Sequence, residues 1–271
     1  MHAPLVSVSR AAARLLAVGL AGSACAADGE RRVWLQLGAF HPNVDSSVQI
    51  TDPAGGVSGT VLSLESDLDL KKSKTLGWVL AGARLGERWR AEFEVFWLRR
   101  SGSRRLSSDI VVVDTTYPAS VVVHSKFESR IYRLGLGNSL PRTPQWEAGM
   151  TLGFTIVLDG QGSLDGGTVT RRREQRDETL PLPTIGAYAS VALTPRWHAA
   201  GRVSLFSMKA RGFDGRLVDL QASVVYRVDP NVGVGIGYRY DDDRLASARS
   251  RYNGRLEYKF RGPQAFVEAT I

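Results

Sequence analysis

Apolar and polar side chains alternate along most of the chain, and the alternation is clearest over residues 233–240. There Val234, Ile236 and Tyr238 share one face of an extended strand, while glycines and Arg239 occupy the other. No stretch of the sequence has the period of a long amphipathic helix that could cover the apolar face. The pattern therefore predicts an all-β protein whose apolar strand faces meet lipid.

The same alternation recurs often enough to predict about ten strands. Most have the roughly nine to eleven residues that cross a membrane at the tilt of a barrel strand. The sequence thus predicts an antiparallel up-and-down transmembrane β-barrel, with eight or twelve strands as alternatives. The ten expected strands cover residues 32–41, 75–85, 89–99, 130–140, 146–158, 183–193, 197–207, 217–228, 232–240 and 264–271.

Short turns and long polar stretches alternate between these strands, as they do in outer-membrane barrels. Trp89, Trp146 and Trp197 directly follow three of the four short turns, which predicts an aromatic girdle on the periplasmic side. Valines 111–113 and 121–123 are expected to form an outer hairpin around Tyr117. The short turns are residues 86–88, 141–145, 194–196 and 229–231, and the long stretches are 43–74, 101–129, 159–179, 209–215 and 241–261.

Charged residues fall in the register opposite to the apolar rows, so we expect them to line the interior. A shift of one residue would place them in lipid, at a few kcal/mol each near the midplane. A ten-stranded barrel is only modestly wider than one that side chains fill, so mutual neutralisation in an occluded interior is favoured over a conducting path. The expected lumen-lining residues are Arg84, Arg90, Glu92, Glu94, Arg133, Glu147, Arg202, Arg227, Arg239 and Glu268.

The first 26 residues have the features of a cleaved secretory signal. Arg10 and Arg14 precede an apolar run, and small residues follow, with cleavage expected after Ala26. The only cysteine, Cys25, would be lost on export, which removes disulfides, thiol nucleophiles and cysteine metal sites. We expect residues 27–271 to form a single barrel domain without a cofactor or a metal.

Several short motifs are similar to those of a known group of proteins. The chain resembles the small outer-membrane β-barrel proteins of Gram-negative bacteria, and within that superfamily an uncharacterised proteobacterial group. The resemblance implies a place in the cell outer membrane and contact with the barrel assembly machinery during biogenesis. The motifs that carry it are residues 37–40 with Pro42, 62–70, 181–183, 194–197 and 262–263.

The chain is basic, with a formal charge of +8 that falls to about +6 once the signal is removed. An exported chain meets the phosphates of lipopolysaccharide before any nucleic acid, so we expect outer-membrane lipid and lipopolysaccharide as partners and no nucleic acid. Arginine forks match phosphate geometry, although a merely solvated loop is equally compatible with them. The expected contact residues are Arg104, Arg105, Arg171, Arg172 and Arg173.

Two classes of function remain open from the sequence. The favoured one is a non-enzymatic barrel, either a surface or structural protein or a narrow solute path with a charged lumen. The alternative is a hydrolase at the extracellular mouth, similar to a lipid A deacylase or a protease. It would use His124 with an acid and a serine, although the Asp-x-His pair of ten-stranded outer-membrane proteases does not occur. The candidate partners are Glu65, Asp67, Asp69, Asp109, Ser125 and Ser129.

Other acidic and glycine-rich stretches carry weaker hypotheses. Glu65, Asp67 and Asp69 alternate with leucines, and a solvated outer rim is favoured over a calcium or acid–base site. Residues 241–243 are interpreted as a charged loop end. The alternating glycines 233–237 do not indicate a nucleotide site, because no helix follows them.

Overall fold

Fifteen strands and no helix make up the part of the chain that this computed structural model describes. That part comprises residues 32–51, 60–112, 115–140, 143, 145–166, 169–174, 180–210, 213–249 and 252–271. The predicted signal peptide, residues 1–26, lies outside it. None of the described residues forms a helix long and apolar enough to cross a membrane.

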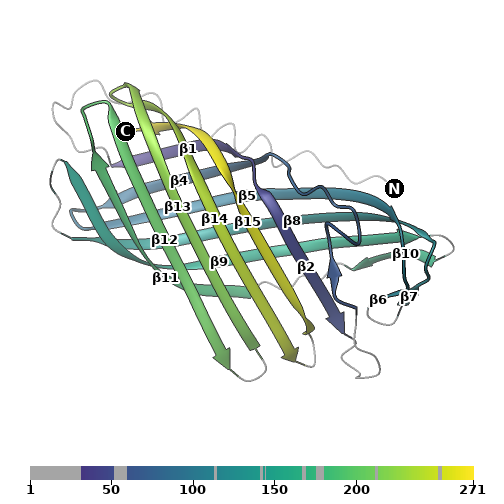
Figure 1. The fold of residues 1–271 in the computed structure, drawn as a ribbon. Helices are drawn as coiled ribbons and strands as arrows, with labels where there is room; N and C mark the ends of the chain where they lie inside the picture. The colour runs from purple at the N-terminus through teal and green to yellow at the C-terminus, as the bar shows by residue number, and fades with distance from the viewer. Residues whose placement is uncertain are drawn as a thin grey trace, which may run out of the picture. The chain divides into compact units, whose positions relative to one another are not determined.

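Ten of the strands form a closed antiparallel barrel (Figure 1). Each strand pairs with the next in the order β1-β4-β5-β8-β9-β11-β12-β13-β14-β15, and β15 pairs back onto β1. This confirms the prediction of an antiparallel barrel with ten strands. The strands are β1 (Val33–Phe40), β2 (Asn43–Thr51), β3 (Leu62–Ser63), β4 (Leu76–Leu85), β5 (Trp89–Arg105), β6 (Ile110–Val112), β7 (Thr115–Tyr117), β8 (Val122–Ser139), β9 (Trp146–Gly166), β10 (Val169–Glu174), β11 (Leu180–Ala192), β12 (Trp197–Ala210), β13 (Phe213–Asp229), β14 (Val232–Arg249) and β15 (Tyr252–Thr270).

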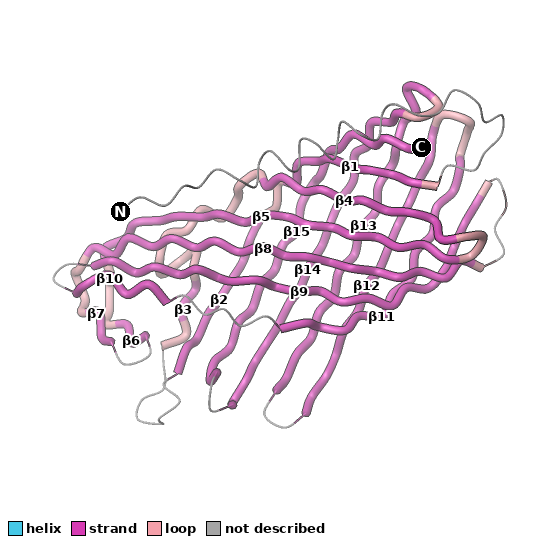
Figure 2. Tube along the Cα trace, turned by 180° about the vertical axis from the view of Figure 1, so that it is seen from behind, coloured by secondary structure: helices cyan, strands magenta, loops and turns pink. Residues whose placement is uncertain are grey.

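Several strands continue well beyond the ends expected from the sequence, so much of the predicted outer loops is paired sheet. The β5–β8 ladder runs to Arg105 opposite Val122, and the β14–β15 ladder runs to Arg249 opposite Tyr252. β2 extends the far end of β15, and β10 pairs with β9. In both views, β12 to β15 and β2 diverge from β5, β8 and β9 toward their outer ends (Figures 1 and 2).

The outer hairpin predicted from the valines of residues 111–113 and 121–123 is wrong in its pairing. β6 pairs with β7 instead, with Ile110 opposite Tyr117. Val122 and Val123 belong to β8, where they continue its regular ladder onto β5. A long uninterrupted ladder already satisfies their backbone groups, so they are not available for a separate hairpin.

The outward face of the barrel is apolar, as lipid contact requires. Exposed leucine, isoleucine, valine and aromatic side chains alternate with inward residues along every long strand. Trp89, Trp146 and Trp197 are all exposed near the short turns, where an aromatic girdle is expected. A hollow of about 1070 Å³ is lined mostly by alanine, valine, serine and glycine residues of the barrel wall.

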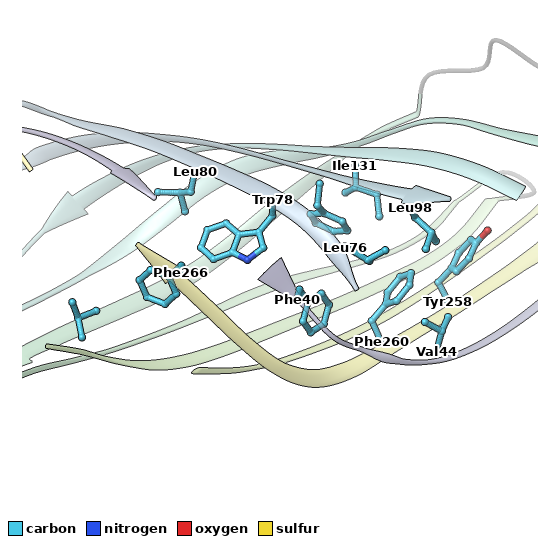
Figure 3. Close-up of a cluster of buried hydrophobic side chains, with 12 residues drawn as sticks. Phe40, Val44, Leu76, Trp78, Leu80, Leu98, Ile131, Tyr258, Phe260 and Phe266 are labelled. Atoms are coloured by element: carbon cyan, nitrogen blue, oxygen red, sulfur yellow. The ribbon is translucent and has the colours of Figure 1, made fainter. Parts of the chain in front are cut away.

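Part of the interior is filled by apolar and aromatic side chains rather than by water. Trp78, Phe96 and Phe266 are almost fully buried there. Figure 3 shows Trp78 and Phe266 side by side, and their ring centres are 5.5 Å apart. Side chains from β1, β4 and β15 pack together because these strands are neighbours around the barrel. This cluster occupies interior volume that an open pore would need.

Gly38 lets the Trp78 ring lie against the wall of β1. A Cβ atom at Gly38 would come within 2.4 Å of the ring, whereas one at Gly77 would have no neighbour within 4 Å. Gly38→Ala is therefore expected to lower the free energy of unfolding by about 1–3 kcal/mol, and Gly77→Ala to change it little. Urea unfolding of the two variants checks this, and equal effects would contradict the packing described.

Candidate functional site

A network of buried charges fills the middle of the barrel. Glu94 from β5 is its centre, and Arg133 of β8, Arg202 of β12 and Arg239 of β14 all make ion pairs with it. β5 and β12 lie on different sides of the closed sheet, so these side chains meet across the interior. We call these four residues, with Asp219 and Asp241, the central network.

The distances within the central network are those of ion pairs. Arg133 Nη1 lies 3.3 Å from Glu94 Oε2 and 2.8 Å from Asp219 Oδ2, and its Nη2 lies 2.5 Å from Asp241 Oδ1. Arg202 Nη2 lies 2.5 Å from Glu94 Oε2. Arg239 is fully buried and also bonds to Glu94. Three guanidinium groups thus face three carboxyl groups, so most of the charge is neutralised inside the network.

Aromatic rings border the central network on one side. The guanidinium carbon of Arg133 lies 4.9 Å from the centre of the Phe96 ring, and that of Arg239 lies 5.6 Å from the same ring. Trp78 and Phe40 are each 5.9 Å from Arg239. Cation–π attraction adds to the ion pairs, and the rings leave less room for water beside the charges.

A second group of polar side chains lies nearer the short turns. Arg84 makes a bidentate ion pair with Glu147, and Ser139 donates to the same carboxylate over 2.7 Å. Arg90 stacks over the Tyr188 ring at 4.1 Å. Arg84 therefore pairs across the barrel with β9 rather than with the acids of neighbouring β5.

Other charged side chains near the short turns also form ion pairs. Arg90 pairs with Glu92, two residues along the same strand. Arg227 Nη2 lies 2.7 Å from Glu268 Oε1, and Gln36 donates to Glu268 Oε2 over 2.6 Å. These groups are partly buried, so they have given up some hydration and depend on one another for compensation.

Another buried ion pair holds the segment of residues 60–74, which we call the strap. Glu65 on the strap pairs with Arg100 of β5, and both side chains are almost fully buried. Ser46 of β2 donates its amide to Glu65 Oε2 over 2.8 Å and its hydroxyl to Oε1 over 2.6 Å. The ion pair thus ties the strap to strands on both of its sides.

Leucines anchor the strap beside this ion pair. Leu62, Leu64, Leu68 and Leu70 pack with Leu106, Ile110 and Val123 in a second apolar cluster. The interpretation of the strap acids as a solvated rim is therefore wrong for Glu65. The leucines need a covered surface, and their burial brings the neighbouring carboxylate under cover with them.

The described residues do not bring the proposed hydrolase groups together. His124 is exposed, whereas Ser125 and Ser129 are buried, because successive side chains of a strand point to opposite faces. Asp67 accepts the amide of Ser63 at 2.8 Å, and Asp109 accepts that of Ala119 at 2.7 Å. Among the described side chains, no hydrogen bond or ion pair joins His124 to an acid. The same part of the chain contains no group of three or more acids, histidines or cysteines placed to hold a metal.

The buried carboxylates in the half of the interior that is farther from the short turns were not predicted from the sequence. Asp219, Asp241 and Asp243 are buried, so the interpretation of residues 241–243 as a loop end is wrong. β14 continues to Arg249, and its period of two places Arg239, Asp241 and Asp243 on one inward face. Extending the alternation past Tyr240 would have revealed Asp241 and Asp243, and Asp219 lies directly opposite Asp241 within the predicted strand of residues 217–228.

The basic residues proposed to contact lipopolysaccharide are only partly described. Arg104 donates to the carbonyl of Ser66, and Arg105 to that of Ser120 at 3.1 Å, so both also support outer loops. The side chains of residues 171–173 on β10 lie outside the described part. Nearby, the hydrogen bond and charge of Lys126 lower the pKa of Glu128, despite partial burial.

The closed ten-stranded sheet, with an apolar outer face and charged groups inside, defines an outer-membrane β-barrel by fold. Among solved structures, it is similar to the outer membrane protease OmpT from Escherichia coli, at 11% identity and a TM-score of 0.55, over 92% of this chain and 100% of that one. This likeness shows the fold alone.

Two further solved structures match the chain with lower TM-scores. The translocator domain of autotransporter NalP from Neisseria meningitidis matches at 11% identity and a TM-score of 0.38, over 97% of this chain and 96% of that one. The Pseudomonas putida toluene transporter TodX matches at 9% and 0.36, over 90% and 91%. No family model matches the chain. No curated protein matches it either, so the resemblance to a particular proteobacterial group stays a prediction.

Proposed function

We propose that this protein resides in the outer membrane as a barrel with a closed interior, and that it acts as a non-enzymatic surface or structural protein. Its partners on this proposal are outer-membrane lipid, lipopolysaccharide and, during biogenesis, the barrel assembly machinery. The observation that carries the proposal is the convergence of Arg133, Arg202 and Arg239 on Glu94 across the interior. Side chains that bond across the lumen occupy the path a solute would follow.

The rest of the interior supports the same conclusion. Aromatic side chains fill the space beside the central network, and the strap packs its leucines inward above it. A polar solute would have to lose its water of hydration to pass this constriction. That loss costs free energy unless polar groups replace the water along the whole path. The long outer hairpins are then the part of the molecule available for contacts with other molecules.

Single-channel recording in a planar bilayer tests the closed interior. We expect the refolded protein to show no discrete conductance steps, since the central network blocks the lumen. The Glu94→Gln and Arg133→Gln variants serve as controls, and the heat-dependent shift in gel mobility verifies that each barrel is folded. Discrete steps in the unmodified protein that both substitutions alter would establish a solute path instead.

A further inference from the structure

The wall of the barrel is incomplete between β11 and β12. The two strands pair from Ala192 opposite His198 to Ile185 opposite Leu205. Beyond that point β11 continues on β9 alone and β12 continues on β13 alone, within the described strands. We call residues 180–184 of β11 and 206–210 of β12 the seam, and both views show the strands diverging there (Figures 1 and 2).

Two prolines account for the seam. The amide of Ala192 donates to the β9 side of the strand over 2.7 Å, and that of Leu193 donates to the β12 side over 2.8 Å. Odd-numbered amides of β11 therefore point toward β12, and at Pro181 and Pro183 those amides carry no hydrogen. Pairing with β9 is unaffected, because it uses the even-numbered residues. The two prolines thus end the β11–β12 ladder and leave the β11–β9 ladder intact.

The seam opens at the level of the outer leaflet. Leu205 follows Trp197 of the girdle by eight residues, which places it about 20 Å higher at the rise and tilt of a barrel strand. The apolar band of such barrels is roughly 25 Å tall. Ile185 and Leu205 both point outward and are about half exposed, so the start of the seam borders hydrocarbon.

A row of inward side chains leads from the seam to a buried carboxyl group. Phe206 on β12 lies opposite Leu217 on β13, which lies opposite Asp243 on β14, which in turn lies opposite Tyr258 on β15. All four side chains are buried. Asp243 is two strands from Phe206, so it lies about 10 Å from the edge of the seam.

Asp243 lines a small apolar cavity on the outer side of the central network. Its Oδ1 atom is buried and has no hydrogen-bond partner among the described residues. The cavity has a volume of about 10 Å³, which is room for roughly one water molecule. Leu182 and Leu245 line this cavity and also pack with Phe206 in the apolar cluster behind the seam. The same side chains therefore border both the cavity and the seam.

We propose that the seam admits a single-chain amphiphile with a primary amine head from the outer leaflet, and that the amine binds Asp243. A primary ammonium group is close to the size of a water molecule and supplies the hydrogen bonds that Oδ1 lacks. The alkyl chain leaves along Leu217 and Phe206 into the hydrocarbon. Parting the strands here breaks no β11–β12 backbone hydrogen bond, since the described seam has no ladder.

This proposal goes beyond the closed barrel and does not depend on it, because the site lies on the outer side of the central network. We propose to test it by electron spin resonance on proteoliposomes of phosphatidylcholine. The probe is octadecylamine with a nitroxide on its chain, compared with equally labelled octadecanoate and octadecyltrimethylammonium. We expect about one more strongly immobilised amine per barrel than for either comparison lipid, because only the amine has a cationic head small enough for the cavity.

Variants on one strand locate the site. Asp243→Asn is expected to weaken binding of the amine at least tenfold, and Asp242→Asn to leave it unchanged. Asp242 is the neighbouring carboxylate, and it pairs instead with Arg244 and Lys259 on the other face of the strand. Equal immobilisation of the three probes, or an unchanged amine affinity in Asp243→Asn, would overturn the proposal. The three-probe comparison uses unmodified protein, so it decides the matter even if Asp243→Asn does not fold.

Discussion

Replacing Glu94 by glutamine is expected to lower the free energy of unfolding by about 3–5 kcal/mol. Glu94 compensates three arginines, and Arg239 among them is fully buried. Glutamine keeps the size of the side chain but removes the charge, so within the central network the arginines keep their ion pairs with Asp219 and Asp241 and lose the one with Glu94. The loss of stability therefore measures the effect of uncompensated buried charge and not the effect of a cavity.

Urea unfolding of the refolded protein in lipid vesicles, followed by circular dichroism, measures this effect. Glu128→Gln is the matched control, because Glu128 lies on the outer part of β8 and pairs with the exposed Lys126. Exposed pairs contribute at most about 1 kcal/mol. If Glu94→Gln lost no more than Glu128→Gln, the central network would not be the electrostatic centre of the barrel.

Arg100→Met is expected to release the strap while the barrel stays folded. Methionine fills much of the volume of arginine, but it leaves Glu65 buried without its cation. Breaking one partner of a buried ion pair costs about 3–5 kcal/mol, and here the strap can escape that cost by opening. The population of the open strap should then rise by more than about 100-fold.

Limited trypsin digestion reads out this opening, because Lys71, Lys72 and Lys74 lie at the end of the strap. Cleavage there, followed by mass spectrometry, should accelerate in proportion to the open population. Arg99→Met is the control, since Arg99 is the preceding residue on β5 and its side chain is mostly exposed. Equal cleavage rates in the two variants would show that Glu65 and Arg100 do not hold the strap.

The alternation of side chains was enough to predict the barrel and its ten strands, because lipid imposes a strict period of two on every membrane-crossing strand. The apolar row from Val33 to Ala39, for example, faces outward as expected. A single register error would place several charges in hydrocarbon, so the membrane part of the fold is strongly determined by local sequence.

The outer half could not be predicted in the same way. Outside the membrane, strand register alone no longer decides whether a charged side chain is stable where it lies. The groups that pair with a buried charge there come from distant parts of the chain. Glu65 meets Arg100 and Ser46 only because β2 and β5 approach each other after closure. The seam could not be predicted from the sequence either. Pro181 and Pro183 indicate where the β11–β12 pairing ends only when it is known which strand lies on each side of β11.

The last strand of the chain completes two structures at once. β15 pairs along its length with β14, and its other edge pairs with β1 and then with β2. The closing contact joins Trp34 to Thr270, near the two ends of the described chain, so its loop-closure entropy is among the largest in the fold. Until β15 is in place, β1 and β14 each present an open strand edge that can pair with another chain. Aggregation during biogenesis should therefore be governed by how quickly the final nineteen-residue strand is delivered.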